Sequence, residues 1–288
     1  MNIQTNQDIS QEAIRCIYCK KVLDETASMY EINEQVHLTC KAQIEEFRKN
    51  QGKLPTEIYN QFQDFFKKFN IIPYRFLTNE ELFSLSRLNL NDRQITYIPK
   101  AIKHFENLRV LAIAGNNLTE LPEEIGQMIH LRILNLSFNK FKEFPSIIKE
   151  LPYIRQFMYS GNKLQTVPEE IINYTDLEVL DLSHNELQEF PQEIGEIQTL
   201  ERLYGQNNKL KSVPEGLKKL RSLRALHLAN NQITTIPNWI DQKHYYLLNL
   251  TNNPIKNIEQ KLQYLKALML NGVVLQSEQD ALTRRKTK

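Results

Sequence analysis

Aliphatic residues recur at a fixed interval over most of the chain. Segments with the pattern LxxLxLxxNxLxxLPxxI begin 23 residues apart, except that the eighth begins 22 residues after the seventh. A fixed period of roughly 20 to 50 residues is typical of a solenoid, in which each repeat packs only on its neighbours. The eight segments begin at Leu85, Leu108, Leu131, Ile154, Leu177, Leu200, Leu223 and Tyr245.

Each repeated residue type has its own physical role. The LxxLxL stretch predicts a short strand whose leucines point inward and whose intervening residues form one exposed face. Asparagine follows where the chain turns, and its amide can bond backbone groups that the turn leaves unpaired. Proline stands on the returning side, where a fixed φ and a missing N–H cost little. The asparagines are Asn116, Asn139, Asn162, Asn185, Asn208, Asn231 and Asn253, and the prolines are Pro99, Pro122, Pro145, Pro168, Pro191, Pro214 and Pro237.

This pattern resembles the leucine-rich repeat superfamily, in particular its 23-residue cytosolic class with an LPxxI segment. The resemblance covers about 190 residues. It implies an α/β solenoid of horseshoe shape, with a parallel sheet on the concave side and short helical or 3₁₀ turns on the convex side. A degenerate ninth repeat runs from Leu265 to Leu275, so we expect repeats over residues 85–276 and a basic tail over 277–288.

The residues before the repeats predict helices. Aromatic side chains recur at helical spacing after Pro55, and Thr78 and Glu81 have the spacing of a capping box. We therefore expect residues 51–84 to form a helical linker and a cap on the first repeat. A partner-binding aromatic stripe is the alternative.

Two repeats lack the third inward leucine. Tyr159 and Gly205 stand in its place. Either the neighbouring side chains accommodate the change in volume, or the strand is irregular and reshapes the exposed face near Tyr204.

All three cysteines lie near the N-terminus, in a CxxC pair followed by an HxxC pair. Two pairs of N and S ligands suit a closed tetrahedral Zn²⁺ site, which is structural because no position remains for water. The arrangement resembles a treble-clef zinc finger and the first half of a LIM domain, over residues 13–50 after a flexible N-terminus at 1–12. No cysteine remains for a second zinc. The four ligands are Cys16, Cys19, His37 and Cys40.

Composition excludes several classes of protein. No apolar run approaches the roughly 18 residues of a membrane-spanning helix, and no phosphate-binding glycine motif occurs. The net charge is only +2, which does not favour a nucleic-acid binder. Without a signal-peptide pattern, and with thiols as metal ligands, we expect a cytoplasmic protein.

A repeat solenoid offers an extended surface, so we expect a non-enzymatic scaffold, monomeric, that binds another protein on its concave face. A nucleic-acid adaptor that uses the zinc module and a regulatory subunit of a signalling or ubiquitin-type enzyme complex remain alternatives. Aromatic, Met and Arg residues are enriched where interfaces concentrate binding energy. The expected contact residues are Phe138, Met158, Asp181, His184, Tyr204 and His227, with Arg132, Arg155 and Arg202 beside them.

Overall fold

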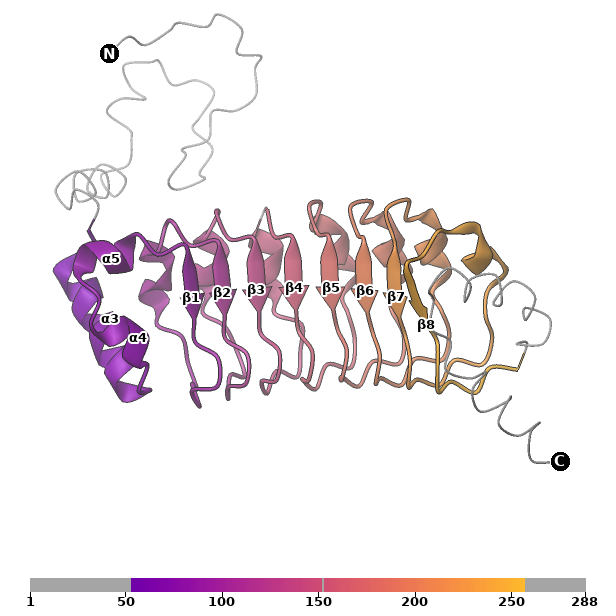
Figure 1. The fold of residues 1–288 in the computed structure, drawn as a ribbon, viewed down its shortest axis with the longest axis horizontal. Coiled ribbons are helices and arrows are strands. Elements are labelled where there is room, and N and C mark those ends of the chain that lie inside the picture. Colours follow the sequence, from indigo (N-terminus) through magenta and orange to yellow (C-terminus); the bar gives the residue numbers. More distant parts are fainter. Residues whose placement is uncertain (1–52, 152, 257–288) are drawn as a thin grey trace, which may run out of the picture.

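The computed structural model describes residues 53–151 and 153–256, arranged as a row of repeats that follows three helices (Figure 1). The helices are α3 (Thr56–Lys68), α4 (Ile72–Arg75) and α5 (Asn79–Phe83). No helix in this part of the chain is long and apolar enough to span a membrane. The predictions for the zinc module, the ninth repeat and the basic tail concern residues outside it.

Eight strands form one parallel sheet in chain order, so each strand pairs with the strands of the two neighbouring repeats. Seven pairings join them, and β3 illustrates the register, because Leu134 pairs with Leu111 and with Phe157. The central residue of every strand is buried. The strands are β1 (Arg87–Asn89), β2 (Val110–Ala112), β3 (Ile133–Asn135), β4 (Gln156–Met158), β5 (Val179–Asp181), β6 (Arg202–Tyr204), β7 (Ala225–His227) and β8 (Leu247–Asn249). The predicted parallel sheet is confirmed.

The strands are shorter than the LxxLxL stretch. Only its third to fifth residues form the strand, because the chain enters from a turn and turns again after the last leucine. The outer leucines still point inward, as Leu131 and Leu136 show on either side of β3.

Proline begins each returning segment, as predicted. Seven 3₁₀ helices have proline as their N-cap residue, from Pro99 to Pro237. They are η1 (Lys100–His104), η2 (Glu123–Gln127), η3 (Ser146–Glu150), η4 (Glu169–Asn173), η5 (Gln192–Glu196), η6 (Glu215–Lys219) and η7 (Asn238–Gln242). The leucine, isoleucine and aromatic side chains of strands and 3₁₀ helices form one continuous core.

The asparagines join successive repeats. Asn139 donates from Nδ2 to the Ile113 carbonyl of the preceding repeat (2.9 Å) and to the Leu136 carbonyl of its own (3.0 Å). Its Oδ1 accepts from the Leu118 N–H (3.0 Å). The predicted amide ladder is confirmed, because the same three kinds of bond are made by Asn116, Asn162, Asn185, Asn208, Asn231 and Asn253.

The helices before the repeats pack on the first repeat. Phe62 of α3 meets Phe105 edge to face, with ring centroids 4.5 Å apart. The capping box of α5 is present: the Thr78 N–H donates to Glu81 Oε2, and the Glu81 N–H donates to Thr78 Oγ1. These aromatic side chains are buried inside the protein rather than offered as a stripe.

Neighbouring side chains accommodate both departures from leucine. Tyr159 is fully buried and donates from its hydroxyl to the Glu143 carbonyl (2.6 Å). At Gly205, a Cβ would lie 2.8 Å from Phe190 Cζ, so the Phe190 ring occupies the space of the missing side chain. Strand β6 pairs in regular register on both sides. The expected accommodation is therefore observed, and the alternative of an irregular strand near Tyr204 is excluded.

Candidate protein-binding surface

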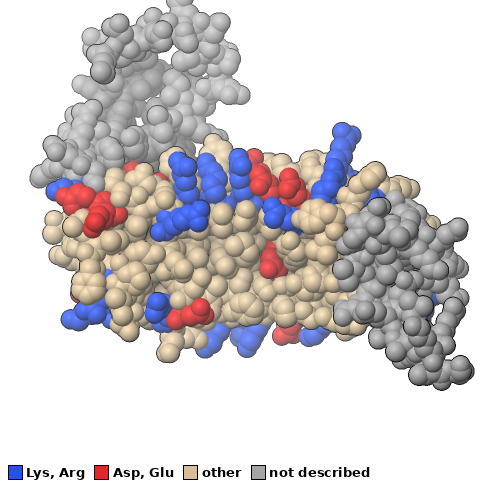
Figure 2. All heavy atoms as spheres, in the orientation of Figure 1, with Lys and Arg blue, Asp and Glu red and all other residues tan. Residues whose placement is uncertain are grey.

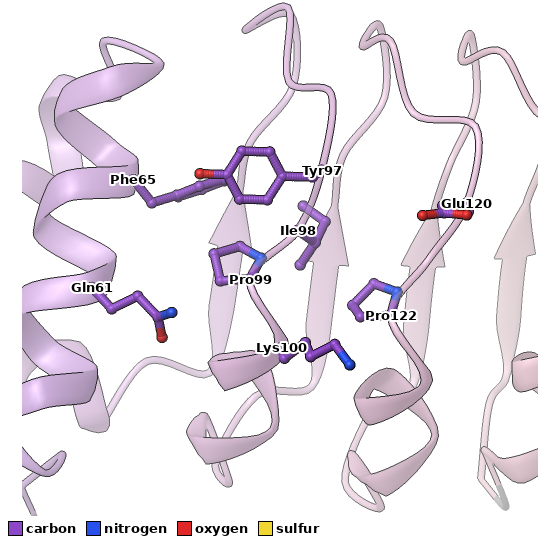
Figure 3. Close-up of a pocket in the computed structure, with 8 residues that line it drawn as sticks. All are labelled: Gln61, Phe65, Tyr97, Ile98, Pro99, Lys100, Glu120 and Pro122. Carbon is purple, nitrogen blue, oxygen red and sulfur yellow. The ribbon is translucent and has the colours of Figure 1, made fainter.

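Two features of the described residues concern sites other than a protein-binding surface. Within the described residues, no group of three His, Cys, Asp or Glu side chains is placed to hold a metal ion. A cavity of about 420 Å³ lies between α3 and the first two repeats (Figure 3). Its lining includes Gln61, Lys100 and Glu120 but no His, Cys or Ser.

The sheet face is the exposed side of strands β1–β8 together with the turn residues that follow each strand. In Figure 2 this face is turned to the viewer, and charged side chains gather along its two edges while its middle is largely uncharged. The charged residues within the eight strands are Arg87, Asp181 and Arg202.

The last residues of four successive strands lie side by side in the middle of this face. Strand pairing places Met158 beside Asp181, Asp181 beside Tyr204, and Tyr204 beside His227. All four side chains are half-buried, so their positions are restricted while part of each remains open to solvent. The structure thus brings together these four predicted contact residues.

Asp181 is held by hydrogen bonds within its own repeat. Its Oδ1 accepts from the Ser183 N–H (3.0 Å) and from Ser183 Oγ (2.6 Å). Ser183 Oγ in turn lies 2.8 Å from Ser160 Oγ in the preceding repeat. This network restricts the orientation of the Asp181 carboxylate on the sheet face.

Burial affects the two ring side chains on the next two strands, Tyr204 beside Asp181 and His227 beside Tyr204. It lowers the pKa of His227 below the ordinary value, with Asp181 acting weakly in the opposite direction. Asn249 donates from Nδ2 to His227 Nε2 (3.0 Å), which requires that nitrogen to be unprotonated. Burial also raises the pKa of the Tyr204 hydroxyl, with Tyr246 as the next cause. Both groups are therefore neutral near pH 7.

The turn residues beside the strands share a left-handed backbone. The two predicted contact residues among them are Phe138, with φ of 54°, and His184, with φ of 52°. Asparagine, aspartate and glycine tolerate this conformation, whereas it is strained for a bulky residue such as phenylalanine. The other six positions are Asp92, Gly115, Gly161, Asn207, Asn230 and Asn252.

Phe138 nevertheless remains 58% exposed. Its ring lies against Gly161, where a Cβ would be only 2.3 Å from Phe138 Cδ1. His184 is held on the far side, since Asn207 donates from Nδ2 to His184 Nε2 (3.0 Å). Bulky residues held in this strained backbone conformation cluster at ligand-binding and other functional sites.

The three predicted arginines are placed differently. Arg132 stacks on the Tyr153 ring (4.8 Å), and Arg155 forms an ion pair with Glu178 (3.3 Å between Nη1 and Oε1). Both precede their strands and do not join the row of four. Arg202 begins β6 and is half-buried on the sheet face.

Sequence reasoning did not identify the residues that hold the contact side chains in place. Ser183 follows Asp181 by two positions, a spacing that favours a local side-chain to backbone bond. The Asp181–Ser183 spacing could therefore have indicated this bond. Gly161 and Asn207 instead contact Phe138 and His184 of the preceding repeat, which sequence spacing within one repeat does not indicate. The predicted ligands Cys16, Cys19, His37 and Cys40 lie outside the described residues.

Family models match the repeats. A model described as a leucine-rich repeat region matches residues 146–252, and the model of the single leucine-rich repeat matches residues 107–128 and 130–151. No curated protein matches the chain significantly.

Solved structures share the fold. A leucine-rich repeat protein of Leptospira interrogans is 31% identical, with a TM-score of 0.59 and 70% of this chain covered. The leucine-rich repeat ectodomain of the receptor kinase GASSHO1/SCHENGEN3 from Arabidopsis thaliana, in complex with CASPARIAN STRIP INTEGRITY FACTOR 2, is 30% identical, with a TM-score of 0.53 and 61% covered. The plant peptide hormone receptor RGFR1 in complex with RGF2 is 25% identical, with a TM-score of 0.51 and 63% covered.

The matched part spans 57% of the Leptospira protein and 22% and 33% of the two plant receptors. The likeness therefore concerns the repeats rather than whole proteins. The family models and the structural neighbours agree that these are leucine-rich repeats. The chain is a leucine-rich repeat protein over residues 107–252.

Proposed function

We propose that the protein is a non-enzymatic scaffold, monomeric and cytoplasmic, that binds another protein on the sheet face, the concave side expected of the repeat family. The observation that carries this proposal is the exposed Phe138 ring, kept in a strained backbone conformation beside the row that runs from Met158 to His227. Two structurally similar plant receptors were solved in complex with named ligands, which supports such a use of this fold.

A comparison of co-purified proteins tests this proposal. The wild-type chain and the double variant Phe138→Ala with Tyr204→Ala would be used as baits, with quantitative mass spectrometry of what each retains. We expect a specific partner whose affinity for the double variant is lower by about 2 kcal/mol or more, on hot-spot magnitudes.

The matched control removes apolar side chains from outside the sheet face. Phe76 and Ile172 are 76% and 41% exposed, and neither lies on a strand. The double variant Phe76→Ala with Ile172→Ala should retain the partner. Equal retention by both double variants, with circular dichroism showing intact repeats, would refute the sheet face as the binding surface.

We also propose that one structural Zn²⁺ is bound by Cys16, Cys19, His37 and Cys40. The support is the spacing of two ligand pairs, which suits a closed tetrahedral site. Metal analysis after purification under reducing conditions should give one zinc per chain. Cys40→Ala should release it and unfold the zinc module only, since binding energy in small zinc modules is largely folding energy. A metal-free wild-type chain would refute this proposal.

A further inference from the structure

The middle of the sheet face carries a carboxylate whose charge is not matched locally. Hydrogen bonds from Ser183 occupy Asp181 Oδ1. Among the ion pairs of the described residues, none includes Asp181, although Arg202 lies on the adjacent strand. The second carboxylate oxygen is therefore available to a partner, and the charge requires a cation for electrostatic complementarity.

Two of the arginines near this face already interact within the protein, so they require an anionic group from a binding partner less strongly. Arg155 already pairs with Glu178, and Arg132 stacks on Tyr153. Both residues directly precede their strands, β3 and β4. Charged side chains of both signs gather along the edges of the sheet face (Figure 2). Asp181 is the one charged residue in the row that runs from Met158 to His227, since Arg202 lies at the opposite end of β6.

The neighbours of Asp181 suit the stem of a long basic side chain. Met158 and Tyr204 flank it in strand register, and both are half-buried. Lysine and arginine place their methylene groups along apolar surface while the charged end reaches a polar partner, and an aromatic face adds a cation–π attraction.

The second anchoring point is apolar. The Phe138 ring lies on Gly161 and reaches toward His184, with ring centroids 6.5 Å apart. Phe138 and Asp181 come from repeats two strands apart, a lateral distance of about 10 Å, and Phe138 stands three residues beyond the position equivalent to Asp181, which adds about 10 Å along the strand direction. The direct separation is thus roughly 14 Å, a length that side chains about four positions apart span in an extended peptide.

We propose that the sheet face binds an extended peptide segment that carries a lysine or arginine and, about four positions away, a large apolar residue. The basic side chain pairs with Asp181 between Met158 and Tyr204, and the apolar side chain packs on Phe138 and His184. This inference rests on the proposed function and specifies the partner of the same surface.

A display library of random peptides, selected on the full chain, tests the inference without a known partner. Enriched peptides should share a basic residue and a large apolar residue at that separation. Their affinity, measured by fluorescence polarisation with synthetic peptides, should fall about ten-fold for Asp181→Asn. It should also fall at high salt, because the interaction is partly between charges.

The chain itself shows that Asp181→Asn keeps the fold. Asn135 and Asn249 occupy the equivalent position in other repeats and accept the same N–H bond two residues on. The matched control is Glu169→Gln, which removes a negative charge from the exposed surface of η4. It should leave peptide affinity unchanged.

The outcomes separate the two proposals. Selection of peptides that lack a basic residue would overturn this inference and leave the proposed function standing. The same holds if the selected peptides bind the Asp181→Asn variant with normal affinity but bind the Phe138→Asn variant more weakly. An unsuccessful selection would also overturn it, since it would exclude a linear segment as the ligand. Only the co-purification experiment decides whether the sheet face binds a protein at all.

Discussion

The Phe138 ring reaches across an entire repeat toward the His184 imidazole, 6.5 Å away, over the bare backbone of Gly161. Both residues occupy the left-handed turn position, with φ of 54° and 52°. Any side chain at residue 161 would displace the ring. Three repeats thus cooperate to present one aromatic side chain to solvent.

Phe138→Asn should stabilise the protein while weakening partner binding. The left-handed conformation costs phenylalanine about 1 kcal/mol more than asparagine, so the free energy of unfolding should rise by up to that amount. Urea denaturation measures the change. Asn207, Asn230 and Asn252 already adopt this conformation in other repeats.

Phe76→Asn is the control for that gain. Phe76 is 76% exposed and has an ordinary φ of −107°. Its replacement relieves no strain and should not stabilise the protein. A loss of stability in Phe138→Asn would show that the ring contributes packing rather than strain.

Asn139→Ala should destabilise the repeats by about 3 kcal/mol. The Leu118 N–H and the Ile113 carbonyl would lose their bonds in the interior, and unpaired buried groups cost about 1–3 kcal/mol each. Asn173→Ala, on the exposed surface of η4, should change the free energy of unfolding by less than about 0.5 kcal/mol. Similar losses in the two variants would contradict a ladder role for Asn139.

Gly205→Leu restores the repeat pattern but should destabilise the protein by about 2 kcal/mol, because the Phe190 ring occupies the space. Combining it with Phe190→Leu should recover much of the loss. A double-mutant cycle by chemical denaturation measures the coupling between the two sites. Additive effects would show that Phe190 does not fill the Gly205 position.

Protonation of His227 should reduce stability in mild acid. Burial lowers the folded-state pKa below the unfolded value of about 6.5, so the unfolded chain binds the proton more tightly. Stability is therefore complete above pH 6.5 and declines as pH falls toward the folded-state pKa. The Asp181 charge raises the pKa of His227 and so opposes this loss of stability. Protonation of Nε2 would also break the hydrogen bond from Asn249, which adds to the loss.

His227→Asn should remove that part of the pH dependence, since Asn249 already occupies the same strand position in the next repeat. Unfolding free energies of the variant and the wild type at several pH values between 5 and 7.5 give the comparison. If the unfolding free energies of the variant and the wild type changed with pH in the same way, another group would be responsible for the loss of stability in acid.

The fold could be read from the periodicity because each repeat makes the same contacts with its neighbours. Asn139 bonds Ile113 in the preceding repeat, and Asn162 bonds Leu136 in the same way. A contact that recurs at a constant sequence separation leaves a periodic pattern in composition. The strand register, the amide ladder and the proline N-caps all follow this rule.

Non-repeating residues on the sheet face make contacts that do not recur from repeat to repeat, so these contacts leave no periodic pattern in the sequence. The sequence indicated which side chains are exposed there, including Phe138, Tyr204 and Arg132. It did not indicate that Arg132 stacks on Tyr153 or that Arg155 pairs with Glu178, because several rotamers and partners are open to a long side chain.

The amino-acid sequence by itself thus determined the solenoid, the inward and outward direction of its residues, and the bonds that join successive repeats. The tertiary structure decided which exposed residues act together. Phe138 projects over Gly161 only because β3, β4 and β5 stand in register, and Asp181 keeps an unmatched charge only because Arg202 does not pair with it. Such contacts depend on which side chains occupy non-repeating positions in several neighbouring repeats. A periodic pattern describes only the repeating positions and does not contain this information.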